Sequence, residues 1–299
     1  MNRPDKVFYN ADGIAIPTDK APPWPVFYLM QPILLIAVYY AAKGTIPFVN
    51  AYGALAIGFI ILTLAERIWP ARVEWTQNLT EWLQVLAMFA ITAAGLAVVE
   101  LLTALANAEA FAGLHAMVAK VWPPSWPLLV NVVIAFVVMQ LFAYWSHRLQ
   151  HEIGILWRVF GHGTHHTYEK LSAINWNTTH PFEAVLLVAP AAILALFFNQ
   201  GEAAFVAAAL VMMQTAIAHT NLRLNERIVG LVLTTNSQHM QHHSAEFDES
   251  QTNYGCAMTF WDRMFGTFSP NPTTALGDPM EGERTIWKRL TLPLRGNAQ

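Results

Sequence analysis

Residues 147–166 read HRLQHEIGILWRVFGHGTHH, and residues 239–243 read HMQHH. Ten of the chain's eleven histidines lie in the window from His147 to His243 that contains both stretches. Their spacing of three or four residues places side chains on one face of a helix. Because neutral imidazole is the commonest metal ligand among side chains, the pattern predicts a metal centre. The chain has three such groups: HRLQH at 147–151, HGTHH at 162–166 and HMQHH at 239–243. Together they supply more nitrogens than one ion can use, which indicates a centre of two metal ions.

The predicted ligand set comprises all ten of these histidines: His147, His151, His162, His165, His166, His180, His219, His239, His242 and His243. The two HxxHH groups are the most specific part, since adjacent histidines are costly to bury unless both bind metal or hydrogen-bond well. The single residues His180 and His219 are also compatible with a turn before Pro181 and with a membrane-interface residue, respectively. His115 has no partner nearby and is left out.

The composition indicates a membrane protein. Only 12% of the residues are charged, 55% are hydrophobic, and the mean hydropathy is +0.34, whereas soluble proteins carry about 25% charged residues. The net charge of −3 provides no basic surface for nucleic acid. A single cysteine, Cys256, excludes an intramolecular disulfide, cysteine zinc ribbons and iron–sulfur ligation.

Apolar segments occur before and between the histidine groups: 25–42, 52–69, 82–105, 128–145, 184–198 and 203–218. A membrane span needs about 20 apolar residues; the second to fourth segments meet this, and the first is short and interrupted by Pro32. The last two form a predicted hydrophobic hairpin, which either crosses the membrane twice or dips in and returns. Both alternatives keep the histidines before and after it on one side, as a shared metal centre requires.

We therefore predict an all-α integral membrane bundle of about four transmembrane helices plus the hairpin 184–218, with a cytosolic helical, histidine-rich di-metal domain. The expected parts are an irregular lead-in at 1–24, transmembrane helices at 25–146, a histidine-box catalytic domain at 147–270 and a tail at 271–299. With the histidines in the cytoplasm, the loops on the opposite side hold only Lys43 and Lys120 of the 17 basic residues, as the positive-inside rule expects. A bacterial inner membrane is the expected location.

The order of the motifs HRLQH, HGTHH, THPFE, HTN and HMQHH, closed by NYG and WDRMFGT, resembles the fatty acid hydroxylase superfamily, in particular its sterol desaturase-like branch. The likeness covers about residues 128–270. It implies a membrane-bound di-iron oxygenase that uses O2 as co-substrate and hydroxylates or desaturates an unactivated C–H bond of a lipid from the bilayer. Because no flavin, haem or nicotinamide motif is present, electrons must come from an external donor of the ferredoxin or cytochrome b5 type.

The resemblance also bears on the metal and its surroundings. THPFE and HTN match family segments and support His180 and His219 as ligands. All-imidazole ligation suits iron, zinc, copper or nickel; the family implies two iron ions, with zinc as a possible substitute in purified protein. Metal-bound histidines usually donate their second N–H to an acceptor, and the carboxylates near the boxes are candidates for that role: Glu152, Glu183, Asp248 and Asp262. No catalytic residue is predicted beyond the metal ligands.

Other functions remain open at this stage. Within the family, the substrate is a sterol, fatty acyl chain, sphingolipid, carotenoid or aminolipid, and a hydroxylase of aminolipid head groups is an explicit alternative. We favour hydroxylation over desaturation, as the simpler outcome of the same chemistry. From a different class, a histidine-rich membrane metal transporter or sensor is disfavoured, because transporters need ionisable ligands within their spans and these apolar runs lack histidine.

Overall fold

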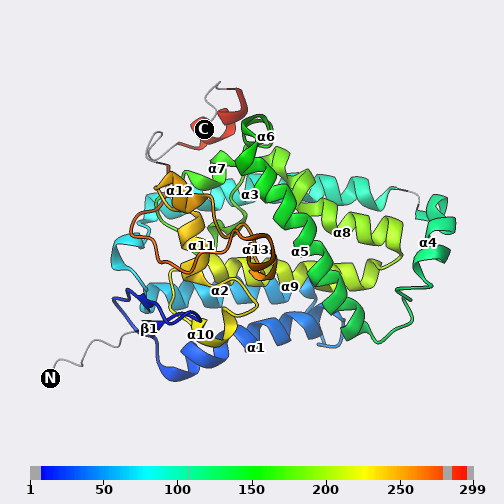
Figure 1. Cartoon of the computed structure of the whole chain (residues 1–299), viewed down its shortest axis with the longest axis horizontal. Coiled ribbons are helices and arrows are strands. Elements are labelled where there is room, and N and C mark those ends of the chain that lie inside the picture. The colour runs from blue at the N-terminus through cyan, green and yellow to red at the C-terminus, as the bar shows by residue number, and fades with distance from the viewer. Residues whose placement is uncertain (1–7, 107, 279–284, 295–299) are drawn as a thin grey trace.

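The computed structural model describes residues 8–106, 108–278 and 285–294, most of them helical (Figure 1). The remaining parts of the predicted lead-in and tail, residues 1–7, 279–284 and 295–299, lie outside the described residues. The all-α membrane bundle predicted from the sequence is confirmed.

Long helices form the body of the molecule: α1 (Trp24–Ala42), α2 (Ala51–Ile68), α3 (Leu79–Ala104), α5 (Leu128–Glu152), α8 (Ala184–Phe198) and α9 (Gly201–His219). Among the described residues, these six, with α8 extended back to Pro181, are long and apolar enough to cross a membrane. The chain is thus a multi-pass membrane protein, and both arms of the predicted hairpin reach the length of a span.

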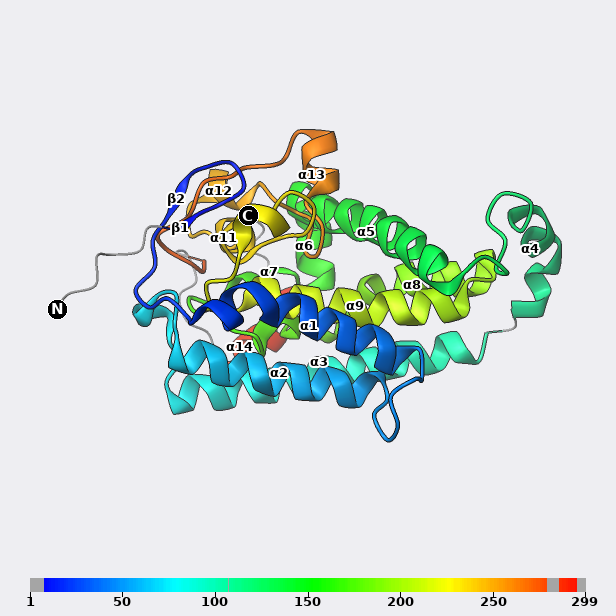
Figure 2. The same ribbon diagram turned by 90° about the horizontal axis from the view of Figure 1, so that it is seen from below.

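Short elements complete the chain: strands β1 (Phe8–Tyr9) and β2 (Ala15–Ile16), and helices α4 (Ala112–Val118), α6 (Gly154–Phe160), α7 (Gly163–His166), α10 (Glu226–Val229), α11 (Asn236–His242), α12 (Phe247–Ser250), α13 (Phe260–Phe265) and α14 (Ile286–Leu290). Short 3-10 turns lie at Val73–Trp75, Ala108–Phe111, Asn175–Asn177, Pro181–Glu183 and Leu292–Leu294. In Figures 1 and 2 the long helices run side by side, with α4 at one end and α11, α12 and the β1–β2 hairpin at the other.

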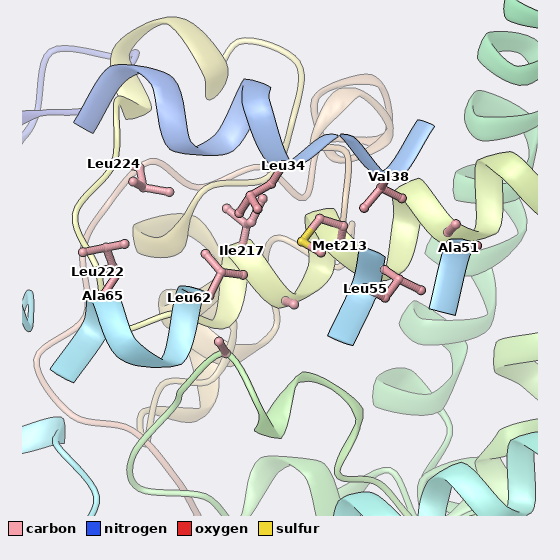
Figure 3. Close-up of a cluster of buried hydrophobic side chains, with 13 residues drawn as sticks. Leu34, Val38, Ala51, Leu55, Leu62, Ala65, Met213, Ile217, Leu222 and Leu224 are labelled. Carbon is pink, nitrogen blue, oxygen red and sulfur yellow. The ribbon is translucent and has the colours of Figure 1, made fainter. Parts of the chain in front are cut away.

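Helix α9 is the centre of the bundle, because it packs against α1, α2, α5 and α8. One buried cluster joins it to α1 and α2, where Leu34, Leu62, Met213 and Ile217 meet (Figure 3). Burying a leucine or isoleucine side chain stabilises a fold by about 1.5–3 kcal/mol in water; in lipid, the gain comes from close packing instead. This packing fixes the position of His219, the last residue of α9.

Polar contacts connect the bundle to the histidine-rich end. Gln31 on α1 donates to Gln214 on α9 at 2.8 Å, and Gln214 donates to the carbonyl of Thr234 at 2.8 Å. Asn236 donates to the carbonyls of Ile217 and Thr220, both at 2.7 Å. Because a buried amide without a partner is unfavourable, these bonds fix the start of α11 against the end of α9.

Both ends of the described chain pack on the histidine-rich end. Within the predicted irregular lead-in, β1 and β2 pair antiparallel, and Asn10 donates to the carbonyl of Pro270 at 2.6 Å. Within the predicted tail, α14 lies on α7: Thr164 donates to the carbonyl of Arg289, and Arg289 donates to the Thr167 hydroxyl, each at 3.1 Å. These three hydrogen bonds join residues more than a hundred positions apart, and no local pattern in the sequence predicts them.

Candidate metal centre

Nine buried histidines form two groups at one end of the bundle, and within each group the ligand nitrogens lie within 4.8 Å of one another. The first group contains His147, His151, His162, His166 and His242, and the second contains His165, His219, His239 and His243. Metal–nitrogen bonds of about 2.0–2.1 Å allow nitrogens on opposite sides of one ion to lie roughly 4.2 Å apart. Each group therefore has the dimensions of one coordination sphere.

Each HxxHH box is divided between the two groups. His162 and His166 belong to the first group, whereas His165 belongs to the second; His239 and His243 belong to the second, whereas His242 belongs to the first. Histidines four residues apart in a box therefore share a group. The remaining histidine of each box, His165 or His242, belongs to the other group. Adjacent rings of the two groups are in contact, as His166 and His243 stack with centroids 4.3 Å apart.

Four different parts of the chain supply these rings. His147 and His151 are one turn apart at the end of α5. Gly161 ends α6 with φ of +72°, and a Cβ at this position would lie 2.4 Å from Cβ of His180. This left-handed residue, which favours glycine, turns the chain from α6 into the box on α7. The side chains of Thr235 and Gln238 then form a capping box that begins α11.

Several rings have their Nδ1 fixed by an acceptor. Nδ1 of His147 lies 2.6 Å from the carbonyl of Tyr254, Nδ1 of His242 lies 2.8 Å from that of Thr252, and Nδ1 of His219 lies 2.8 Å from that of Thr215. Nδ1 of His162 lies 2.7 Å from Oε1 of Glu183. Because carbonyls and carboxylates accept only, each Nδ1 donates, and in a neutral ring Nε2 then carries the lone pair.

The lone pairs fixed in this way face one another. Nε2 of His147 lies 2.8 Å from Nε2 of His162 and 3.0 Å from Nε2 of His242. In the second group, Nε2 of His219 lies 3.0 Å from Nε2 of His239. In the first group, three acceptors converge with no proton between them, which is unfavourable unless a cation binds there. The residues present therefore fit a metal ion.

Electrostatics keep these rings neutral. Burial lowers the pKa of the His165 imidazole to about 3. Burial first, and neighbouring imidazoles second, also hold the pKa well below its ordinary value in His166, His239, His242 and His243. A pKa below physiological pH leaves the ring uncharged with its lone pair free, the form that binds a metal.

Asp262 acts on the centre through the backbone. It accepts the N–H groups of Tyr254 and Gly255 at 2.7 and 2.9 Å and the Thr267 hydroxyl at 2.8 Å. Burial raises the pKa of this carboxyl to about 6. A Cβ on Gly255 would lie 2.1 Å from the Met258 carbonyl, so glycine is required for this close approach. The turn at Tyr254 and Gly255 directs the Tyr254 carbonyl to His147. The NYG and WDRMFGT segments therefore act together to orient the His147 ring.

The other predicted carboxylates differ in position. Glu183 is buried and hydrogen-bonds both His162 and the Thr179 hydroxyl. Glu152 instead pairs with Arg148 at 2.7 Å, and its side chain is 43% exposed. Asp248 is exposed in the first turn of α12. We therefore retain Glu183 as a direct partner of the centre and no longer include Glu152 and Asp248, because solvent-facing carboxylates do not reach the rings.

His180 is the one predicted ligand that lies outside both groups. Its Nδ1 accepts the N–H of Phe182 at 3.2 Å, and its Nε2 lies 3.2 Å from the carbonyl of Leu290. With one nitrogen accepting and the other donating, a neutral ring has no lone pair left for a metal. We therefore take His180 as a contact between the 3-10 turn at Pro181–Glu183 and α14, beside the centre.

Apart from Glu183, the acceptors that orient the rings were missed in the sequence, because they are backbone carbonyls. The carbonyls of Thr215, Thr252 and Tyr254 leave no signal in a side-chain pattern. Only the position of Thr215 follows from helical spacing, since it lies four residues before His219 on α9. The other two come from the loop between α12 and α13, whose path depends on the whole fold.

A cavity of about 580 Å³ with mainly apolar walls opens from the centre into the bundle. His147, His162 and His219 line one end, and Tyr52, Glu100 and Gly201 line the other. Since Gly201 and His219 are the two ends of α9, a rise of about 1.5 Å per residue makes the cavity roughly 27 Å long. It is therefore an elongated apolar space that ends at the histidines.

We expect Glu183→Gln to weaken metal binding by about 10–100-fold, the usual effect of removing an acceptor behind a metal-bound histidine. The amide keeps the size of the side chain but removes the charge that orients Nδ1 of His162. Metal retained after a timed chelator challenge measures the effect, with Glu152→Gln as the matched control. Equal retention in the Glu183 variant and the wild type would contradict the role of this carboxylate.

The fold and the site describe a multi-pass membrane protein with two groups of buried histidines, each of which fits one metal ion. In comparisons with known proteins, residues 132–267 match the model of the fatty acid hydroxylase family. The resemblance to the fatty acid hydroxylase superfamily is thereby confirmed.

Curated relatives are similar to this chain over about half of its length or more. Ornithine lipid hydroxylase OlsE of Rhizobium tropici is 28% identical over 227 residues, covering 73% of this chain and 66% of that protein. Alkylglycerol monooxygenase of Danio rerio is 32% identical over 152 residues, covering 50% and 32%. A putative methylsterol monooxygenase of Dictyostelium discoideum is 28% identical over 148 residues, covering 48% and 53%. The chain thus spans less than two thirds of the length of each, and no solved structure matches it.

Proposed function

We propose that this protein is an O2-dependent, membrane-bound di-iron oxygenase that hydroxylates an unactivated C–H bond of a lipid. The observation that carries the proposal is the apolar cavity of about 580 Å³ that ends at two groups of converging imidazoles. Relatives named as lipid hydroxylases and monooxygenases support it. Electrons come from an external donor of the ferredoxin or cytochrome b5 type.

Two iron ions, when bound, would activate O2, with the overall balance of R–H, O2, two electrons and two protons giving R–OH and H2O. The residues of this chain would hold the metal ions and keep water away from them. The nine histidines of the two groups are the proposed ligands. Glu183 and the Tyr254 carbonyl fix the rings of His162 and His147. All nine rings are buried, and exclusion of water protects the reactive site from side reactions.

The cavity brings the substrate to the centre without taking it out of the bilayer. It is lined from α3, α5, α8 and α9, where Leu96, Met139, Leu187 and Ala208 supply apolar contacts. An alkyl chain lying in this space keeps an apolar environment along its length. In this proposal residues 25–146 form the membrane part, 147–270 form the catalytic part, and the histidine-rich end faces the cytoplasm of a bacterial inner membrane.

Two alternatives bear on this proposal. A hydroxylase of aminolipids is supported by the relative named as an ornithine lipid hydroxylase. A metal transporter needs ligands distributed along a pathway through the spans. The nine histidines instead gather at one end of the bundle, and α1, α2, α3 and α8 carry none, which favours a resident centre.

The test is lipid oxidation under labelled oxygen. Membranes containing the protein, loaded with iron and supplied with a reducing system, are incubated under ¹⁸O2, and extracted lipids are analysed by mass spectrometry. We expect one labelled oxygen atom in a lipid product, absent from membranes with His165→Ala. Metal-loaded, reduced protein that adds no label to any lipid would refute the oxygenase proposal, and metal flux in proteoliposomes would favour transport.

A further inference from the structure

Two side-chain amides beside the metal centre have no hydrogen-bond partner among the residues that the structure describes. Gln150 is 2% exposed and Asn177 is 3% exposed, and neither amide bonds to any described residue. The carbonyl oxygen of each is fully buried and unpaired. Every other buried asparagine or glutamine of the described residues makes at least one side-chain hydrogen bond. Buried amides without partners are unfavourable, so these two require an explanation.

Both unpaired amides line the apolar cavity at its metal end. Gln150 lies on α5 between His147 and His151, and Asn177 is the last residue of a 3-10 turn. His147 lines the cavity with them. Gln140, which lines the same cavity further along α5, is already used: it accepts the N–H of Ala257 at 3.2 Å. The cavity thus offers unused polar groups at the place where oxidation would occur.

From this arrangement we propose that Gln150 and Asn177 form a recognition subsite for the polar group of the lipid substrate. The subsite takes a neutral hydrogen-bonding group, such as an amide or a hydroxyl, carried at the end of an alkyl chain. This inference rests on the proposed lipid oxygenase and narrows its substrate class. The alkyl chain extends along the apolar cavity, and the oxidised carbon lies near the polar group.

The chemistry of the subsite favours a neutral group over a charged one. A side-chain amide both donates and accepts, which complements an amide or a hydroxyl in either orientation. The nearest carboxylate that lines this part of the cavity, Glu183, is already bonded to His162 and Thr179. The other lining carboxylate, Glu100, lies at the opposite end of the cavity, where it is hydrogen-bonded to Tyr52. The opposite orientation of the lipid would place its polar group there instead.

Binding of two matched ligands to the full-length protein in detergent tests the subsite without electrons or O2. A radiolabelled long-chain N-methyl amide is displaced by the unlabelled amide or by the alkane of equal length, with micelle partitioning measured in protein-free controls. The variants are Gln150→Met with Asn177→Leu, which preserve size, and Gln84→Met, the same change on α3 outside the cavity.

We expect the wild type and Gln84→Met to prefer the amide by about tenfold or more, and the double variant to bind amide and alkane equally. Removing unpaired amides should leave the melting temperature unchanged or raised, whereas purely structural amides would lower it. Equal binding of amide and alkane in the wild type would overturn the inference. The side chains of Gln150 and Asn177 would then bind water rather than the lipid. Loss of the preference in Glu100→Gln rather than in the double variant would overturn it by placing the polar group at the far end.

The two proposals fail separately in these assays. Amide preference without lipid oxidation would refute the oxygenase function and leave the subsite standing. Lipid oxidation without amide preference would refute only the subsite.

Discussion

Replacing His242 with alanine is expected to remove one of two metal ions and to lower lipid oxidation by more than a hundredfold. His242 belongs to the first group, where its Nε2 lies 3.0 Å from that of His147. Its Nδ1 is bound to the Thr252 carbonyl, which orients Nε2 toward the other rings of the group. Removing an acceptor that hydrogen-bonds a metal ligand lowers metal affinity or activity by roughly 10–100-fold. Removing the ligand itself should have a larger effect. Metal content per chain and turnover, measured on the same preparation, check the expectation.

His180→Ala is the matched comparison, because it removes a histidine beside the centre that lies in neither group. We expect this variant to keep both metal ions and to melt at a lower temperature, since it loses the contacts with Phe182 and Leu290. Metal loss in His180→Ala, with full metal in His242→Ala, would reverse our assignment of these two residues.

Ala143→Phe is expected to abolish lipid oxidation, to below about 1% of the wild type, while both metal ions stay bound. Ala143 lines the cavity one helical turn before His147 on α5. A phenyl ring there fills the part of the cavity next to the metals, and a displacement of even about 1 Å from the productive position costs about a hundredfold. Turnover against several lipid classes, with metal content on the same samples, measures the effect.

Ala97→Phe on α3 is the control for this variant. Ala97 is exposed on the outer surface and does not line the cavity, so the same added volume there should leave turnover within about twofold of the wild type. If Ala143→Phe oxidised lipid as fast as Ala97→Phe, the cavity would not be the route of the substrate.

Much of the fold could be predicted because its signals are local. An uncharged run such as 128–145 must be either a span or a core helix, and the low charge content of 12% favours the span. The spacing of His147 and His151 places both on one face of α5. These features depend only on residue type and helical period.

The division of the histidines between two groups could not be predicted in this way. His165 and His166 are neighbours in the sequence and belong to different groups, because Gly161 and the short α7 set their directions. The sequence likewise favoured His180 through the THPFE motif, whereas the backbone placed its nitrogens on Phe182 and Leu290. Such outcomes depend on the path of loops and on contacts between distant segments.

Metal stoichiometry of the wild-type protein, by plasma mass spectrometry after expression with iron supplied, tests the central claim most directly. Two equivalents of iron per chain, or of zinc standing in for it, are the predicted result, one for each group of histidines. Zero or one equivalent in folded protein with its helices intact would contradict the two-metal centre and the oxygenase built on it.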